Sequence, residues 1–289
     1  MRYPVTLTCH AKVNLCLAIT ARDTDGYHEL VSAVCFTSFG DKITIIPSAA
    51  HEISYEGPFA KALQQAGGDS LMQQTAALAG QKEAHHILLN KQIPLGGGLG
   101  GGSADAAAYL RYLSAHLSEK DKAQLRASAE ALGADVPACF DNRAHIMAGR
   151  GAQSYPIEMP DNLPVMVITN PLIHSDTGAV FARYAQSSLP FRDITAQQIG
   201  ALFKKAAWGD IMAIGNDLTN AACQLYPQIN TLLYEMGEAG KQIGDDFIAA
   251  QMTGSGASCF ALLQDEEAAK TYCEKLTEKG IWAVVTDLF

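Results

Sequence analysis

Apolar and polar residues alternate at the start of the chain with the period of two that is typical of a β-strand. Every odd position from Val5 to Ile19 is apolar, and the even positions from Thr6 to Asn14 are polar. Strands usually have about five or six residues, so this pattern predicts two strands or one strand interrupted by a bulge. Lys12 and Asn14 then share one face. Lysine there fits a solvated face as well as a functional site, whereas asparagine is uncommon inside strands.

Similar patterns predict the other elements of the chain. Further strands are expected at 41–46, 86–93, 165–169, 248–252, 258–263 and 281–286, with a hairpin over 144–157. Helices are expected at 70–81, 106–117, 118–133, 176–185, 194–207, 226–239 and 265–279. The β–α–β arms of the second half, joined by a tight glycine turn, predict a ferredoxin-like α+β layer. Prolines between 156 and 164 mark a boundary, so we expect one domain over 1–160 and another over 161–289.

The segment Pro94–Asp105 carries the strongest chemical signal, because six of its twelve residues are glycine. It leads into an alanine-rich predicted helix with Ser103 as its N-cap and Asp105 in its first turn. Backbone N–H groups of such a loop and helix N-terminus form a nest suited to phosphates. A flexible linker is the alternative, but Leu99 within the run and the helix after it argue against one. The Gly-Lys-Ser/Thr of a P-loop is absent from the sequence, and the acidic residue of a dinucleotide fingerprint would fall in a predicted helix.

Two other places carry side chains of possible chemical use. Asp135 lies just before Val136-Pro137, in a tight connection after the predicted helix end at Gly133, where a capping or turn aspartate is the simpler interpretation. Tyr27 and His28 follow the Asp25-Gly26 turn. The turn accounts for the Asp-Gly pair, but it does not account for two neighbouring rings.

The composition limits the partners of the protein. A net charge of −9 over 289 residues argues against nucleic acid and against an anionic membrane surface as partners. Seven scattered cysteines without a Cys-x-x-Cys spacing favour a reducing compartment, so we expect a cytoplasmic protein. The sequence shows no signal-peptide pattern at its start and no apolar run of membrane-spanning length.

Three separated segments together resemble the motifs of the GHMP small-molecule kinases: Ala11–Leu15, Pro94–Ser103 and Met252–Ala257. Further segments at 25–30, 133–137 and 216–218, and Asn170-Pro171 with Thr177 downstream, resemble members of that family that act on a cytidine-linked alcohol. The resemblance implies an α+β two-domain GHMP kinase. Its amino-terminal domain would be ribosomal-protein-S5-like and bind ATP, and its ferredoxin-like carboxy-terminal domain would contribute to the substrate cleft.

The resemblance also implies the reaction and the site residues. ATP, with Mg²⁺, would phosphorylate the 2-hydroxyl of a methylerythritol linked to cytidine diphosphate, with Lys12 and Asp135 as catalytic residues and Asp135 as the base. The residues implied for ATP binding are Pro94, Gly96, Gly97, Gly98, Leu99, Gly100, Gly101, Gly102 and Ser103, of which Ser103 would also lie near the metal. Those implied for substrate binding are Asn14, Tyr27, His28, Asp135, Thr177, Phe181, Gly254, Ser255 and Gly256.

Two other functions are compatible with the motifs. Another GHMP kinase could phosphorylate a small alcohol without a nucleotide, although the Tyr27-His28 pair argues against this. A non-catalytic nucleotide-binding module could use the same fold, but such a module needs the phosphate nest and has no use for Lys12 and Asp135. We expect a monomer or a homodimer. Ser70 stands where the family usually has an asparagine near the adenine, so it is not part of the predicted site.

Overall fold

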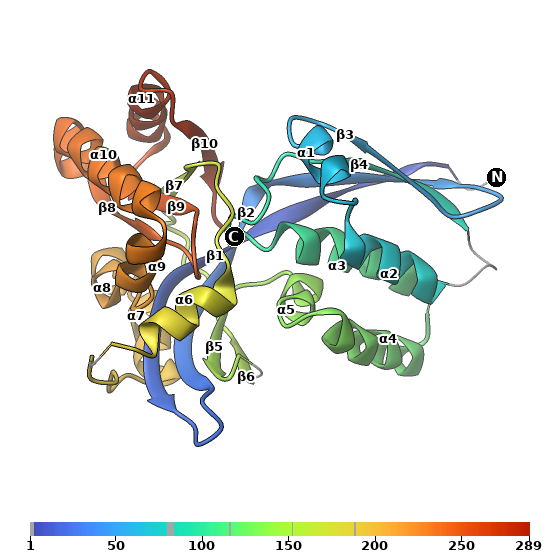
Figure 1. Ribbon diagram of the computed structural model, residues 1–289, viewed down its shortest axis with the longest axis horizontal. Helices are drawn as coiled ribbons and strands as arrows, with labels where there is room; N and C mark the ends of the chain where they lie inside the picture. The colour runs from blue at the N-terminus through green and yellow to red at the C-terminus, as the bar shows by residue number, and fades with distance from the viewer. Residues whose placement is uncertain (1–2, 80–83, 116, 152, 188) are drawn as a thin grey trace. The chain divides into compact units, whose positions relative to one another are not determined.

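The computed structural model describes residues 3–79, 84–115, 117–151, 153–187 and 189–289 (Figure 1). Contacts between Cα atoms divide the chain into two compact units, and this division does not follow one cut in the sequence. The first unit is Met1–Lys12, Gly40–Leu95 and Gly100–Asn142, and the second is Val13–Phe39, Gly96–Leu99 and Arg143–Phe289. The strands β1 (Val5–Arg22) and β2 (His28–Pro47) each contribute residues to both units. The domain boundary near residue 160 stays a prediction.

The first unit packs helices against a short sheet. Strand β4 (His85–Asn90) pairs antiparallel with the end of β2 and parallel with β3 (Glu52–Glu56). The helices are α1 (Ala60–Gln65), α2 (Ser70–Ala79), α3 (Gly101–Ser114), α4 (Glu119–Leu132) and α5 (Val136–Asp141). Helix α3 contacts α2, α4 and α5, and its residues from Ala104 to Leu110 are all buried (Figure 1). Its alanines allow these neighbours to approach closely, so the helix that follows the glycine loop is held on several sides.

The second unit contains the ferredoxin-like sheet that the sequence predicts. Its strands are β7 (Val165–Asn170), β8 (Phe247–Met252), β9 (Cys259–Leu263) and β10 (Trp282–Asp287). They lie in the order β10-β7-β9-β8 with every neighbouring pair antiparallel, which is the order of a β-α-β-β-α-β fold. Helix α10 (Pro227–Ile243) contacts β8, α11 (Glu266–Thr277) contacts β7, and the two helices lie against each other (Figure 1).

Other elements of the second unit surround this sheet. The hairpin of β5 (His145–Gly149) and β6 (Gln153–Pro156) pairs with the start of β2, which places Gly149 opposite Leu30. The remaining helices are α6 (Thr177–Tyr184), α7 (Ala196–Lys204), α8 (Trp208–Ile214), α9 (Thr219–Leu225) and the 3₁₀ turn η2 (Gly244–Asp246). Within the described residues, no helix is both long enough and apolar enough to cross a bilayer.

The structure corrects several predictions about individual elements. Strand β1 is one strand of 18 residues, where the pattern predicts two strands or an interrupted one. Strand β2 begins at His28, whereas the sequence predicts a strand only from residue 41. The pattern misses the earlier part because the residues from Leu30 to Phe36 are buried on both faces and show no alternation. Helix α3 begins at Gly101 with Gly100 as its N-cap, so the prediction of Ser103 as the cap is wrong. The predicted helix end at residue 81 lies outside the described residues.

Candidate active site

The glycine loop has the backbone geometry of a phosphate nest. Gly96, Gly98 and Gly100 have φ angles of 63°, 76° and 66°, a left-handed conformation that glycine adopts without steric cost. Left-handed residues that alternate with others make successive N–H groups converge on one point. Helix α3 follows at once, since the N–H of Ala104 donates to the carbonyl oxygen of Gly100 at 2.8 Å. The first N–H groups of a helix have no partner within it, so the loop and the helix start together suit an anion.

The first half of the glycine loop is fastened to the second glycine turn of the chain, and both lie in the second unit. The N–H of Ser258 donates to the carbonyl oxygen of Gly97 at 2.9 Å, and that of Ser175 donates to Gly96 at 3.2 Å. A Cβ atom built on Gly98 would lie only 2.5 Å from the carbonyl oxygen of Gly256. The two backbones therefore approach more closely than any side chain would permit.

Lys12 and Asp135 form an ion pair in the first unit. The Nζ of Lys12 is 3.0 Å from the Oδ2 of Asp135, with the lysine side chain 7% exposed and that of the aspartate 37% exposed. Asp135 occupies the N-cap position of α5, but its side chain makes no capping hydrogen bond in the part of the chain that is described. The simpler interpretation of Asp135 as a capping residue is therefore not supported. Lys12 also lies beside the start of α3, because a Cβ on Gly100 would be 3.4 Å from the Cβ of Lys12.

Asn14 is held in one orientation in the second unit. Its side-chain Nδ2 donates to the Oγ of Ser32 at 2.7 Å, and its backbone N–H donates to the Oγ1 of Thr253 at 2.8 Å. The side chain is buried, and its Oδ1 lies 3.3 Å from the position of a Cβ on Gly254. The structure thus brings Asn14 and the second glycine turn together, as the predicted substrate site requires.

Other side chains support the second glycine turn. The hydroxyl groups of Thr177 and Ser255 lie 2.7 Å apart, and the hydroxyl of Ser175 donates to the carbonyl oxygen of Ser255 at 2.9 Å. Asn216 donates its Nδ2 to the carbonyl oxygens of Met252 and Gly254, at 2.9 and 2.8 Å. The sequence-based site omits Ser175 and Asn216. Asn216 belongs to a segment that resembles the family, so a signal for it existed, whereas nothing in the sequence singles out Ser175.

Aromatic side chains gather near the turn before β2. The ring centroid of His28 is 5.8 Å from that of Phe181 and 5.4 Å from that of Tyr184. Burial lowers the pKa of His28 below its usual value, and the nearby charge of Arg22 adds to this effect. A neutral imidazole can both donate and accept a hydrogen bond, which suits the edge of a nucleobase. Tyr27 is 65% exposed, so its ring is available for stacking. The sequence predicts His28 with Phe181 but not Tyr184.

A buried charge cluster lies beside the start of α3, in the first unit. The Nζ of Lys91 is 2.6 Å from the Oδ2 of Asp41 and 2.6 Å from the Oδ2 of Asp105. Burial favours a lower pKa for Lys91, but the charges of Asp105 and Asp41 outweigh burial and raise that pKa. Asp41 Oδ1 also accepts the backbone N–H of Ile93 at 2.8 Å. Asp105 thus has a buried lysine as its partner. Because α3 begins at Gly101, Asp105 lies beyond the first turn, so the prediction of a first-turn residue at the positive end of the helix dipole is wrong.

Replacing Lys91 with Met should lower the free energy of unfolding by about 3–5 kcal/mol, because it would leave two buried carboxylates without their cation. Urea denaturation followed by circular dichroism measures this loss. Lys122→Met is the control, since Lys122 pairs with Glu119 on the surface of the same unit and its loss should cost less than about 0.5 kcal/mol. Equal stabilities for the two variants would show that the cluster makes no special contribution.

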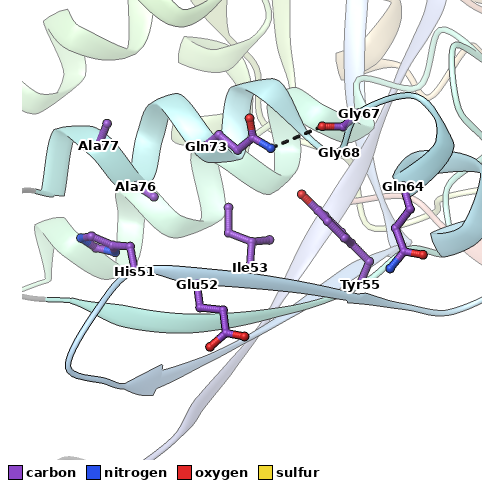
Figure 2. Close-up of a pocket in the computed structure, with 10 residues that line it drawn as sticks. All are labelled: His51, Glu52, Ile53, Tyr55, Gln64, Gly67, Gly68, Gln73, Ala76 and Ala77. Atoms are coloured by element: carbon purple, nitrogen blue, oxygen red, sulfur yellow. Dashed lines mark hydrogen bonds between the residues drawn. The ribbon is translucent and has the colours of Figure 1, made fainter.

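A separate pocket of about 680 Å³ lies in the first unit between β3 and α2. Figure 2 shows Ile53 and Tyr55 on β3 and Ala76 on α2 at this pocket, with the side chain of Gln73 donating to the carbonyl oxygen of Gly67. The ten lining residues are His51, Glu52, Ile53, Tyr55, Gln64, Gly67, Gly68, Gln73, Ala76 and Ala77. None of the residues predicted for catalysis or binding is among them.

Comparison with known proteins gives the class to which these sites belong. A family model described as "GHMP kinases N terminal domain" matches residues 60–143, and one described as "GHMP kinases C terminal" matches residues 200–281. The chain belongs to the GHMP kinases, and the two-domain α/β fold of that family, predicted from its motifs, is confirmed. Its curated relatives are more specific. The chain is 36% identical to the "4-diphosphocytidyl-2-C-methyl-D-erythritol kinase" of Parvibaculum lavamentivorans over 93% of this chain and 92% of that protein.

Two further relatives agree with this placement. The protein of the same name from Rhizobium etli is 37% identical, over 98% of this chain and 94% of its own length. A crystal structure of 4-(cytidine 5'-diphospho)-2C-methyl-D-erythritol kinase matches with a TM-score of 0.77 at 27% identity, over 98% of this chain and 99% of that one. The structure of L. major mevalonate kinase with R-mevalonate has a TM-score of 0.66 at 15% identity over 99% and 98% of the two chains, which shows a shared fold alone.

Proposed function

We propose that this protein transfers the γ-phosphoryl group of ATP to the 2-hydroxyl of 4-diphosphocytidyl-2-C-methyl-D-erythritol, a step of non-mevalonate isoprenoid precursor biosynthesis. The observation that carries the proposal is the Lys12–Asp135 ion pair at 3.0 Å, beside the helix that continues the glycine loop. A module that only binds nucleotides needs no such pair. The relatives that bear the name of this kinase support the choice of substrate.

The glycine loop would hold the ATP phosphates. Its left-handed glycines at 96, 98 and 100 leave no Cβ atom in the way, and the first turn of α3 with Ser103 adds further N–H groups. The segment from Pro94 to Ser103 is the proposed ATP-binding loop. Mg²⁺ would neutralise phosphate charge, and Ser103 is the proposed protein group near it.

Lys12 and Asp135 would act directly on the transfer. The carboxylate of Asp135 is partly exposed, so it can receive a substrate hydroxyl and accept its proton. The ammonium group of Lys12 would compensate the negative charge of the transferred group and hold the carboxylate in place. Phosphoryl transfer depends mainly on positioning and on charge compensation, which these two residues and the loop supply.

Further residues of the predicted site would bind the substrate. Tyr27 and Phe181 would stack on the cytosine, and His28 would form hydrogen bonds with its edge. Asn14 would hold the reacting hydroxyl, and the turn Gly254–Gly256, with Thr177 on Ser255, would close over the phosphates. The fixed orientation of Asn14 and the hydrogen bonds that fasten the turn support these roles.

The cysteines and the net charge bear on the cellular location and the partners of the protein. All seven cysteines are free thiols, which agrees with a cytoplasmic protein. The net charge of −9 opposes nucleic acid as a partner, so the proposed partners are small molecules and, at most, a second copy of this chain.

A substrate comparison tests the proposed function. The purified protein, with ATP and Mg²⁺, is given either the cytidine-linked alcohol or the same alcohol without its cytidine, and ATP consumption is measured. We expect kcat/KM to be at least about 100-fold higher for the cytidine-linked compound, because Tyr27, His28 and Phe181 would have no base to bind in the other compound. Equal turnover of both would indicate another GHMP kinase. Binding of ATP without turnover of either would favour the non-catalytic module.

A further inference from the structure

Arg150 lies at the tip of the β5–β6 hairpin, next to the turn that carries Tyr27. Its neighbours Gly149 and Gly151 have φ angles of 65° and 92°, which allow the tight turn that projects the arginine. Gly149 pairs with Leu30 of β2 in the sheet register, so the hairpin and the start of β2 are fixed relative to each other within the second unit. The position of Arg150 is therefore set by the sheet.

The guanidinium group of Arg150 binds both aspartates of the turn. Its Nε donates to the Oδ2 of Asp23 at 2.7 Å, and its Nη2 donates to the Oδ2 of Asp25 at 2.7 Å. Asp25 in turn accepts the backbone N–H of Tyr27 at 3.2 Å, and the N–H of Asp23 donates to the carbonyl oxygen of Tyr27 at 2.8 Å. Arg150 thus binds the two aspartates that are themselves hydrogen-bonded to the backbone of Tyr27.

The same guanidinium group also lies over the aromatic ring of Tyr27. The Cζ of Arg150 is 5.0 Å from the ring centroid, within the range of a cation–π contact. The Tyr27 side chain is otherwise largely exposed, at 65%, so one ring face meets the arginine and most of the ring is open. An exposed tyrosine without such a contact would exchange between rotamers and would lose side-chain entropy when a base stacked on it.

We propose that Arg150 is a positioning residue for nucleobase recognition: it holds the Tyr27 ring from one side so that a pyrimidine can stack on the open side. The arginine acts through the tyrosine, because its Nε and Nη2 donate to Asp23 and Asp25 and its guanidinium group lies over the Tyr27 ring. The inference rests on the proposed function, in which Tyr27 stacks on cytosine.

Steady-state kinetics of Arg150→Met test this role. We expect KM for the cytidine-linked alcohol to rise by about 3–10-fold, while KM for ATP and kcat at saturating substrate change by less than about two-fold. Tyr27→Ala should raise the same KM by about 10-fold or more, because base stacking on a ring is lost. The double variant should match Tyr27→Ala alone, since an arginine that acts through the ring has no effect once the ring is absent. The KM of Arg150→Lys should lie between those of wild type and Arg150→Met, because lysine keeps the positive charge but lacks the planar guanidinium group.

Lys279→Met is the matched control for a partly exposed ion pair. Lys279 pairs with Glu235 in the same unit at 2.5 Å and with similar exposure, so its variant should keep the wild-type KM. Two results would overturn this inference alone, provided that the wild type turns over the cytidine-linked alcohol. One is an unchanged KM for that compound in Arg150→Met. The other is a double variant whose KM rises by the product of the two single effects. No turnover of the cytidine-linked alcohol by wild type would overturn the proposed function, and the inference with it.

Discussion

Replacing Asp135 with Asn should lower kcat for the cytidine-linked alcohol by about 10²–10⁴-fold, the usual effect of removing a general base. Asparagine has the same shape but cannot accept the proton of the attacking hydroxyl. The fold should persist, because the carboxylate makes no capping hydrogen bond to α5 within the described part of the chain and forms a partly exposed ion pair with Lys12 at 3.0 Å. Steady-state kinetics with both substrates varied separate this loss of kcat from any change in KM, and urea denaturation checks stability.

Asp121→Asn is the control for this variant. Asp121 is an exposed aspartate in the first turn of α4, where it accepts a hydrogen bond from the hydroxyl of Ser118, so kcat should stay within about two-fold of wild type. If kcat of Asp135→Asn also stayed within about ten-fold of wild type, Asp135 would be a positioning residue. A loose transition state allows this, because the hydroxyl proton is then released only late.

Periodicity in the sequence predicts the elements that have one buried face. Helices α10 and α11 lie near their predicted positions because apolar residues recur there at helix spacing. The strands β7 and β9 are buried on nearly every position, and a short apolar run between turn residues predicts them. Strand β2 from His28 to residue 40 mixes polar and apolar residues without a regular spacing, so neither signal applies to it. The short helices α8 and α9 each have seven residues, too few for a helical period to show clearly.

In the candidate site, the sequence reveals residues that are neighbours along the chain but not partners that are far apart in it. The glycine loop and the pair of Tyr27 and His28 are contiguous in sequence, so a motif can reveal them. The partners of Arg150 are 125 and 127 positions away, and Lys91 is 50 positions from Asp41. Such pairs depend on strand register and on the path of loops, which a single sequence does not encode in any local pattern. Charged residues of this kind are therefore predicted as solvated surface until the fold is known.

Replacing Gly98 with Ala should lower kcat/KM by about 100-fold, a typical effect of a small misplacement of reacting groups. The φ angle of 76° at this position costs an alanine about 1–2 kcal/mol in conformational energy. The added Cβ would also lie 2.5 Å from the carbonyl oxygen of Gly256. Because that oxygen belongs to the backbone, no change of side-chain rotamer can relieve the contact. The glycine loop and the second glycine turn would have to separate, so we expect the phosphate nest to lose its geometry while α3 and the ferredoxin-like sheet stay folded. Kinetics with ATP and the cytidine-linked alcohol measure the loss, and circular dichroism checks the fold.

Gly200→Ala is the control, because Gly200 lies in α7 with no atom within 4 Å of an added Cβ. Alanine there should raise the free energy of unfolding by at most about 1 kcal/mol without changing the kinetics. Wild-type kcat/KM in Gly98→Ala would show that the close approach of the two glycine segments is not needed for phosphoryl transfer.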